Sequence, residues 1–210
     1  MHKETLAPQT AALFVKLATS GLCGRESGFY LAGGTALALQ LGHRQSEDLD
    51  FFTAAHLLPT NLVSDLAAIG RVEVVQEEDR TIHMVLDGVK VSFLSFPYPL
   101  AFPTLPCEGI MLADQRDIAA MKLSAVSSRG AKKDFFDLFF LLRAYSLAQM
   151  ILFFETLFAG KEYNTLHILK SLAYFDDAEH DPDPMMLMSV TWGEVKEVIT
   201  REAHALVPLV

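Results

Sequence analysis

The sequence predicts an α+β fold, in which a mixed sheet flanked by helices is followed by a helical half. Residues 29–53 read in order as a short strand, a glycine turn, a helix and a second strand. Residues 71–96 hold three β-like runs, two of which are separated by an Asp-Gly dipeptide typical of β-hairpins. After a segment rich in proline, the chain is helical in character to its end. We therefore expect an α/β core over residues 1–110 and a helical subdomain over residues 111–210 that closes the site.

The first strand is expected at residues 29–32, a short apolar run that suits the end of a buried strand. Gly33-Gly34 breaks this strand, because glycine lets the backbone turn sharply and come close to a ligand. Thr35 is expected to be the N-cap of the helix that follows. Gly42 is expected to end that helix in the left-handed conformation.

Two aspartates distinguish the second strand, which is expected at residues 48–52. Side chains alternate on a strand, so Asp48 and Asp50 share one face while Leu49 and Phe51 point the other way. Neighbouring like charges repel each other unless a cation or hydrogen-bond donors lie between them. Mg²⁺, which one or two carboxylates hold together with substrate phosphates, is the natural occupant. The alternative is that the aspartates merely cap or solvate an edge strand.

The spacing between the glycine turn and the aspartate pair resembles that of a known protein family. Gly33-Gly34, thirteen intervening residues and Asp48-x-Asp50 resemble the signature of the polymerase-β-type nucleotidyltransferases. The longer string GGTALALQLGHRQSEDLDFF is similar to the AbiEii/AbiGii toxin family of nucleotidyltransferase-like proteins. The resemblance implies a nucleotidyltransferase-like sheet, in which the glycine turn and Thr35 hold the phosphates and the paired aspartates bind magnesium. It also implies the toxin half of a toxin–antitoxin or phage-defence pair, and hence a cognate antitoxin protein.

The polar turn before the second strand supplies two further expected nucleotide contacts, Arg44 and Ser46. The same turn argues against a haloacid-type phosphatase, which also uses an Asp-x-Asp pair with magnesium. That family expects a hydrophobic strand before its first aspartate and a Thr or Val four residues after it. Here polar residues 43–47 come before Asp48, and Phe52 occupies the later position.

The β-rich segment bears on the chemistry of the site. Its strands are expected at residues 71–76, 82–86 and 89–96. Asp87-Gly88 is the expected turn between the last two. Nucleotidyltransferases of this superfamily commonly carry a third carboxylate on such a strand, as the general base for the attacking hydroxyl. Here Ser92 or Lys90 stands where that acid is expected, which leaves the base unassigned.

Residues 96–109 contain four prolines and are expected to form a rigid connector. The helix that follows opens at Asp114 or Asp117 and contains Lys122. The residues three and four positions from Lys122 are apolar, so they form an apolar helix face around it. Because an unpaired lysine is unfavourable on such a face, we expect Lys122 to face a phosphate site.

Asp134 and Asp137 lie three residues apart in an otherwise apolar helical segment, where acids are rare unless they are paired. The family resemblance extends here, because Asp117, Lys122 and either Asp134 or Asp137 look like a later Asp-to-Lys segment and a further aspartate. It implies that Lys122 neutralises triphosphate charge, and that the aspartate positions the nucleotide or replaces the missing strand acid. We count Lys122 and Asp137 as catalytic together with Asp48 and Asp50, and Asp134 as a nucleotide contact.

Structural roles are the alternatives for these residues. Asp117 suits a helix N-terminus, where negative charge complements the helix dipole. Asp134 would then be an N-cap, and Asp137 would pair with Arg129.

The remaining elements carry less information on function. Further helices are expected at residues 8–20, 62–69, 147–158, 165–175 and 192–206. Thr191 and Glu194 form a capping box at the start of the last one. Residues 176–183 are interpreted as a solvated acidic linker. Among the histidines, only His43 lies near the motif, and it is interpreted as a turn residue.

The composition of the chain limits the classes of protein to which it can belong. The 210-residue chain is 51% hydrophobic and 20% charged, which suffices for a packed core. Its apolar runs fall short of the ~18–20 residues that a membrane span needs, and the first ten residues lack the apolar region of a secretory signal. Cys23 and Cys107 have neither metal-site nor disulfide-framework spacing. We expect a cytoplasmic protein without membrane contact.

The net charge of −9 argues against a protein that wraps long stretches of nucleic acid, although a site for one nucleotide or an RNA end is compatible with it. We expect magnesium-dependent transfer of a nucleotide from an NTP to a tRNA or protein acceptor. The alternative is a non-catalytic module of the same fold that binds nucleotide, a protein partner or both. Ser92 in place of an acid favours this alternative, and the intact aspartate pair disfavours it.

Overall fold

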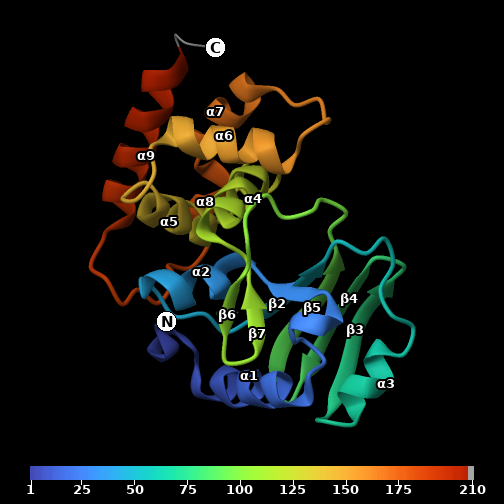
Figure 1. Cartoon of the computed structure of the whole chain (residues 1–210). Helices are drawn as coiled ribbons and strands as arrows, with labels where there is room; N and C mark the ends of the chain where they lie inside the picture. Colours follow the sequence, from blue (N-terminus) through green and yellow to red (C-terminus); the bar gives the residue numbers. More distant parts are fainter. Residues whose placement is uncertain (208–210) are drawn as a thin grey trace. The chain divides into compact units, whose positions relative to one another are not determined.

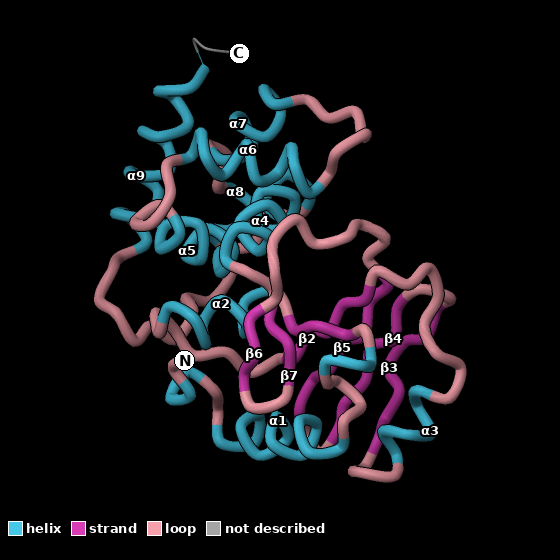
Figure 2. The backbone as a smooth tube through the Cα atoms, viewed as in Figure 1, coloured by secondary structure: helices cyan, strands magenta, loops and turns pink. Residues whose placement is uncertain are grey.

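The computed structural model describes residues 1–207. The chain forms two compact units that divide after Asp114. Figure 1 gives the order of the elements, and Figure 2 shows that the strands belong to the first unit. The mixed sheet with its helices confirms the predicted α+β class.

The helices and strands of the first unit follow one another in chain order as η1 (Lys3–Thr5), α1 (Pro8–Ser20), η2 (Arg25–Ser27), β1 (Phe29–Leu31), α2 (Gly33–Leu41), β2 (Leu49–Thr53), α3 (Leu62–Ala67), β3 (Val72–Glu78), β4 (Thr81–Leu86), β5 (Val89–Ser95), β6 (Leu105–Cys107) and β7 (Ile110–Leu112). α1 spans the residues predicted for it, and the strands predicted before residue 96 are confirmed with shifts of one or two residues at their ends.

The seven strands have the order β3-β4-β5-β2-β1-β7-β6. β2 lies in the middle of this sheet, antiparallel to β1 and parallel to β5. β4 and β5 form the predicted hairpin, and both turn residues, Asp87 and Gly88, have positive φ. α1 packs against β5 (Figure 1).

One face of the central strands is apolar and buried. Leu49 and Phe51 of β2 are fully buried, and Val91 and Phe93 of β5 lie beside them with at most 1% exposure. The rings of Phe51 and Phe93 stack with their centroids 5.2 Å apart. Burial of such a side chain contributes about 1.5–3 kcal/mol relative to leaving it exposed. This burial fixes the register of β2 against β5, because a slip of one residue would expose the whole row.

A hairpin occupies the last part of the expected connector at residues 96–109. β6 pairs with β7, and Leu112 of β7 aligns in parallel with Leu31 of β1. β6 is the edge strand, where Pro106 is tolerated because an outward-facing N–H is not needed there. The prediction of a connector was wrong for this part, because strands of three residues are too short to show an alternating pattern.

The second unit consists of helices α4 (Gln115–Ser128), α5 (Lys132–Leu141), α6 (Leu147–Leu157), α7 (Thr165–Leu172), α8 (Asp176–Glu179) and α9 (Trp192–Leu206). Thr191 and Glu194 form the predicted capping box of α9. Trp192 stacks on Phe136 of α5 with ring centroids 5.7 Å apart, so it joins the two helices. Among the described residues, no helix is long and apolar enough to cross a membrane.

The acidic segment at residues 176–183 is mostly exposed, as its interpretation as solvated expects, but it is more than a linker because part of it is helical and contacts α5. α8 occupies its first half. Asp181 accepts a hydrogen bond from the backbone N–H of Lys132 at 3.0 Å, and Asp183 lies 3.2 Å from the Lys132 amine. Lys132 is buried, and its amine also lies 5.5 Å from the centre of the Trp192 ring. The segment therefore anchors the start of α5.

Candidate functional site

β2 places two carboxylates on one face of the first unit's sheet. Asp50 lies within β2, and Asp48 comes one residue before its first residue. Both are half-buried, whereas Leu49 between them is fully buried. Because the apolar side chains fill the buried face, the alternation of the strand directs both carboxylates to the opposite, partly exposed face.

Gly33 brings the start of α2 against Asp50. Gly33 has a φ of +65°, a backbone conformation that other residues rarely adopt. A Cβ atom on Gly33 would lie 3.3 Å from Oδ2 of Asp50, so the glycine also allows a close approach. The Ala32 N–H, just before it, donates to the backbone carbonyl of Asp50 at 3.0 Å. The N–H groups at a helix start carry partial positive charge, so Gly33-Gly34 presents a helix end suited to an anion beside a carboxylate.

Thr35 and Ser46 hold the backbone that leads into β2. The prediction of Thr35 as N-cap was wrong, because α2 begins at Gly33 with Ala32 in the N-cap position. The buried Thr35 hydroxyl donates to the backbone carbonyl of Asp48 and lies 2.7 Å from Oγ of Ser46. These contacts fix the position of the Asp48 backbone.

The turn that contains Ser46 is itself buried. Arg44 is 4% exposed, and its guanidinium donates to the backbone carbonyl of Gln45 at 2.9 Å. His43, the histidine next to it, is fully buried. Both side chains therefore belong to the packed interior of the turn.

A row of polar side chains continues from Asp50 across the neighbouring strands. Asp50 of β2 aligns with Ser92 of β5, and Ser92 aligns with His83 of β4. Nδ1 of His83 lies 3.0 Å from Oγ of Ser92. Ser92 thus occupies the place beside Asp50 where the superfamily pattern expects a third carboxylate.

His83 is the candidate that the sequence interpretation missed, since only His43 was placed near the motif. The signal was present in the alternation of β4. Ile82 and Met84 are buried, so His83 between them must point to the opposite face. Only the alignment of β4 with β5 shows that this is the face of Asp50.

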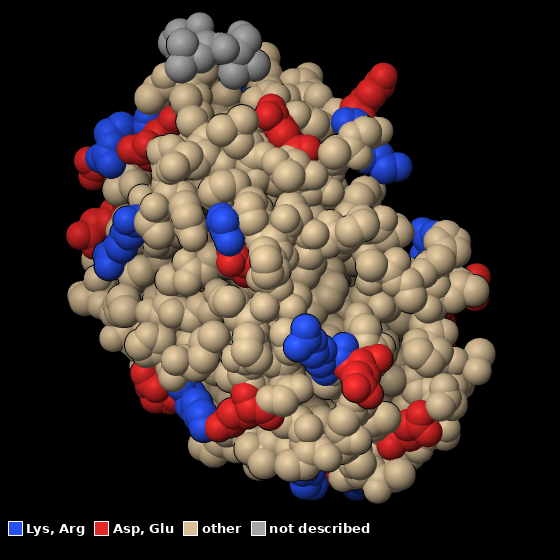
Figure 3. Space-filling model, in the orientation of Figure 1, with Lys and Arg blue, Asp and Glu red and all other residues tan. Residues whose placement is uncertain are grey.

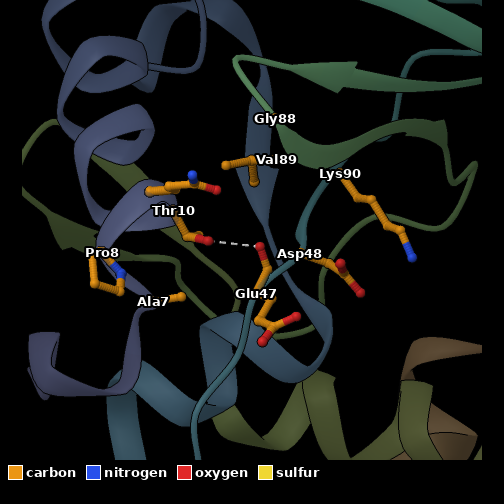
Figure 4. Close-up of a pocket in the computed structure, with 9 residues that line it drawn as sticks. Ala7, Pro8, Thr10, Glu47, Asp48, Gly88, Val89 and Lys90 are labelled. Carbon is orange, nitrogen blue, oxygen red and sulfur yellow. Dashed lines mark hydrogen bonds between the residues drawn. The ribbon is translucent and has the colours of Figure 1, made fainter.

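A pocket of 270 Å³ lies over this row and is lined by Asp48, Asp50, Val75, His83, Met84, Val85, Lys90, Val91 and Ser92. A second pocket, of 510 Å³, shares Asp48 and Lys90 with it and extends to the start of α1 (Figure 4). In Figure 4 the side chains of Asp48 and Lys90 extend to the same side, and the dashed line joins Thr10 to the Glu47 carbonyl, at 2.8 Å. Asp48 and Lys90 therefore lie where the two pockets meet.

The donor set at this site suits magnesium better than a metal held by protein alone. Among residues 1–207, no group of three or more His, Cys, Asp or Glu side chains could hold a metal ion. Asp48 and Asp50 offer two carboxylates on one face. Mg²⁺ is commonly held by one or two carboxylates while substrate phosphates and water complete its coordination, so the pair fits this ion.

The second unit contains a buried ion cluster formed by Lys122, Asp134 and Asp137. The Lys122 amine lies 2.6 Å from Asp134 and 2.5 Å from Asp137. The lysine side chain is 6% exposed and both aspartates are fully buried. The expectation that Lys122 is unpaired was wrong, because two carboxylates already balance its charge.

The cluster also differs from the structural alternatives. Ala131 is the N-cap of α5, so Asp134 is not. Arg129 lies 3.3 Å from Asp134 and so pairs with this residue, whereas the alternative had Arg129 paired with Asp137. Asp117 is fully buried in the first turn of α4, the position that its structural role predicts.

Charged side chains on the visible face of the molecule are scattered. Figure 3 shows Lys and Arg near Asp and Glu, without an extended patch of either sign. This face offers no long basic track for a nucleic-acid backbone.

Comparisons with known proteins identify the family to which this chain belongs. The family model described as "Nucleotidyl transferase AbiEii toxin, Type IV TA system" matches residues 21–205. An uncharacterized protein of Aquifex aeolicus (strain VF5) is 36% identical over 197 residues, which cover 89% of this chain and 90% of that protein.

Solved structures share the fold at low sequence identity. JHP933 from Helicobacter pylori has a TM-score of 0.56 at 20% identity, covering 96% of this chain and 93% of its own. The nucleotidyltransferase toxin MenT4 from Mycobacterium tuberculosis has a TM-score of 0.59 at 15% identity, covering 96% and 86%. These similarities identify the sheet and its helices as a nucleotidyltransferase fold.

Proposed function

This chain belongs to the AbiEii family of nucleotidyl transferase toxins, and from that premise we propose that it transfers a nucleotide from an NTP to an RNA or protein acceptor with the help of Mg²⁺. The observation that carries the proposal is the placement of Asp48 and Asp50 on one face of β2, with the Gly33 turn against Asp50. Carboxylates and an anion-binding helix start are the two kinds of group that a magnesium–triphosphate substrate requires.

Each part of the site has a role in this proposal. Asp48 and Asp50 would hold Mg²⁺, which when bound offsets the charge of the phosphates. The backbone at Gly33-Gly34 binds the triphosphate through helix N–H groups. Thr35 and Ser46 keep the Asp48 backbone in place through their buried hydrogen bonds. The acceptor hydroxyl attacks the α-phosphorus, the bond to pyrophosphate breaks, and pyrophosphate leaves.

A narrower proposal concerns the buried cluster of the second unit. We assign Lys122 to neutralisation of triphosphate charge, Asp137 to catalysis and Asp134 to nucleotide positioning, as the family resemblance implies. Since Lys122 is paired with both acids, binding of a phosphate by its amine requires the loss of one carboxylate contact. In this proposal, the ion pairs between Lys122 and the two aspartates rearrange when substrate binds.

The partner and the acceptor are the remaining parts of the proposal. Membership of a toxin family supports a cognate antitoxin protein that binds this chain and restrains it. A tRNA or a protein is the proposed acceptor. A tRNA would be engaged at its end, since the protein's net charge of −9 does not favour binding along a nucleic-acid backbone.

A second candidate function is a non-catalytic module that binds nucleotide or a protein partner. Ser92 favours it, because a hydroxyl stands beside Asp50 where the superfamily has a carboxylate base. The two candidates differ in one measurable property, which is whether any acceptor becomes labelled.

The test is incubation of the protein with each α-labelled NTP, Mg²⁺ and either total RNA or a cell lysate, followed by separation of RNA and protein. We expect label in one class of acceptor with wild-type protein and none with Asp50→Asn. Asp79→Asn is the matched control, because Asp79 is an exposed acid of the same unit in the turn between β3 and β4. Calorimetric binding of an NTP without labelling of any acceptor would favour the non-catalytic module. No binding and no labelling would overturn the transferase and leave only a module that binds a protein partner.

A further inference from the structure

The row Asp50, Ser92, His83 crosses three neighbouring strands on one face of the sheet. Residues directly opposite each other on adjacent strands share a face and have neighbouring side chains. Adjacent strands lie about 4.8 Å apart, so the backbone of His83 lies roughly 10 Å from that of Asp50. The 270 Å³ pocket covers this interval and is lined by all three residues.

Ser92 fixes the imidazole of His83 within this row. The Oγ–Nδ1 distance of 3.0 Å is that of a hydrogen bond. When Nδ1–H donates to the serine oxygen, the proton of the neutral ring is on Nδ1 and Nε2 carries a lone pair. Ser92 itself has no basic atom, but with its oxygen as the acceptor the lone pair of Nε2 of His83 is available for a proton.

The charged groups around His83 come from each strand of this part of the sheet. Asp48 and Asp50 lie on the β2 side, and Lys90 lies on β5. On β3 the residue opposite His83 is Gln76, whose amide lies 2.8 Å from Glu78. Of the described residues that line the pocket, His83 alone has an imidazole, the side chain that ordinarily gains and loses a proton near neutral pH.

We infer that His83 replaces the missing third carboxylate as the general base for the acceptor hydroxyl, with Ser92 as its positioning residue. This inference rests on the proposed function and names the group that it left unassigned. The proton of the acceptor hydroxyl passes to Nε2 of His83 as the oxygen forms its bond to the α-phosphorus. The bond between the α-phosphorus and pyrophosphate breaks, and pyrophosphate leaves with the bonding electrons. His83 then returns the proton to solvent.

The test compares His83→Gln with His56→Gln, an exposed histidine of the same unit that does not line the pocket. A general base typically contributes 10²–10⁴-fold, so His83→Gln should lower the transfer rate by about that factor. His56→Gln should transfer at the wild-type rate. NTP affinity should stay within about twofold in both variants, because a base acts in the transition state and not in ground-state binding.

Two further measurements separate a base from a structural residue. The pH dependence of the transfer rate should differ between wild type and His83→Gln, because a general base acts only in its unprotonated form. In the double variant His83→Gln/Ser92→Asp, a carboxylate stands beside Asp50, and the rate should recover at least about tenfold over His83→Gln alone.

The outcomes distinguish the inference from the function on which it rests. If wild type labels an acceptor and folded His83→Gln does so equally well, the inference is overturned while the function stands. If His83→Gln is slow but the double variant is no faster and the pH dependence is unchanged, His83 is structural and the inference also fails. If wild type neither binds an NTP nor labels an acceptor, the proposed function fails and the inference falls with it.

Discussion

The amine of Lys122 lies 2.5 Å from a carboxylate oxygen of Asp137, and both side chains are buried in the second unit. Asp134, also buried, lies 2.6 Å from the same amine and is shared with Arg129. Two acids thus face two cations, of which only Arg129 is exposed to solvent. Such a cluster is sensitive to the loss of one member, because each buried charge that remains loses part of its compensation.

Lys122→Met should therefore lower the free energy of unfolding by about 3–5 kcal/mol, the usual effect of breaking a buried ion pair. Lys170→Met is the matched control, because Lys170 is an exposed lysine of α7, and it should change stability by less than about 0.5 kcal/mol. Urea unfolding of the three proteins measures the effect.

The double variant Lys122→Met/Asp137→Asn tests the cause of this loss. Asparagine keeps the shape of Asp137 but removes the buried charge that has lost its contact with Lys122, so the double variant should be more stable than Lys122→Met. A Lys122→Met protein that is as stable as wild type and has lost NTP binding would contradict this account.

Magnesium should stabilise the wild-type protein through Asp48 and Asp50. Without the ion, Asp50→Asn should unfold at the same temperature as wild type or slightly higher, because it removes repulsion between neighbouring carboxylates. With Mg²⁺ and an NTP, wild type should gain stability by ligand linkage, about 2.7 kcal/mol at 100 times the Kd, and Asp50→Asn should gain far less. Thermal melts with and without both ligands test this, with Asp79→Asn expected to behave as wild type. Equal gains in Asp50→Asn and wild type would exclude Asp50 as a ligand.

Gly33→Ala should damage both the fold and the site. The left-handed backbone costs a non-glycine residue roughly 1–2 kcal/mol, and the new Cβ would lie 3.3 Å from Oδ2 of Asp50. Gly160→Ala separates the two effects, because Gly160 has a φ of +81° but no heavy atom within 4 Å of a built Cβ. Both variants should lose similar stability, but only Gly33→Ala should also weaken binding of magnesium and NTP. Unimpaired binding in Gly33→Ala would show that the turn does not position Asp50.

Stability at alkaline pH should depend on Cys23. Burial raises the pKa of this thiol from 9.0 to about 12, because the thiolate is disfavoured away from water. The folded protein therefore keeps the proton at a pH where the unfolded chain loses it. The stabilisation from Cys23 is complete below pH 9 and is lost as the pH rises toward 12, by up to about 1.4 kcal/mol per pH unit.

Unfolding of wild type and Cys23→Ala between pH 8 and 11 measures this contribution. Lysines and tyrosines titrate in the same range, so the difference between the two slopes is the relevant quantity. Stability should fall more steeply with pH in wild type than in Cys23→Ala, and equal slopes would contradict the effect of burial.

The elements predicted correctly from the sequence are those whose signals are local. Pro8–Ser20 is bounded by a proline and a glycine, the β4–β5 turn is an Asp-Gly dipeptide, and Asp48 and Asp50 alternate with buried apolar residues. Each of these depends on neighbours in the chain, and each was assigned without knowledge of the tertiary structure.

The predictions that failed concern residues whose surroundings are formed by segments distant in the sequence. His83 was overlooked because its relation to Asp50 depends on the alignment of β4, β5 and β2. The sequence does not show that Lys122 is paired, because its partners Asp134 and Asp137 lie on another helix. Thr35 was taken as an N-cap because its hydrogen bond to the Asp48 carbonyl spans the whole turn between α2 and β2. That the helical half closes the site stays a prediction.

The parallel alignment of Leu31 with Leu112 has a consequence for the newly made chain. β1, β2 and β5 can associate once residue 95 is available, but the other side of β1 stays open until β7 has been synthesised. All three residues of β1 are buried in the finished protein, so this open side is an apolar strand edge that can pair with another chain. A ribosome that stalls between these points would release an aggregation-prone fragment in which the strands of the carboxylate pair are already present. The short β6–β7 hairpin, which is the last part of the sheet to be made, therefore covers the open edge of β1 and completes the sheet.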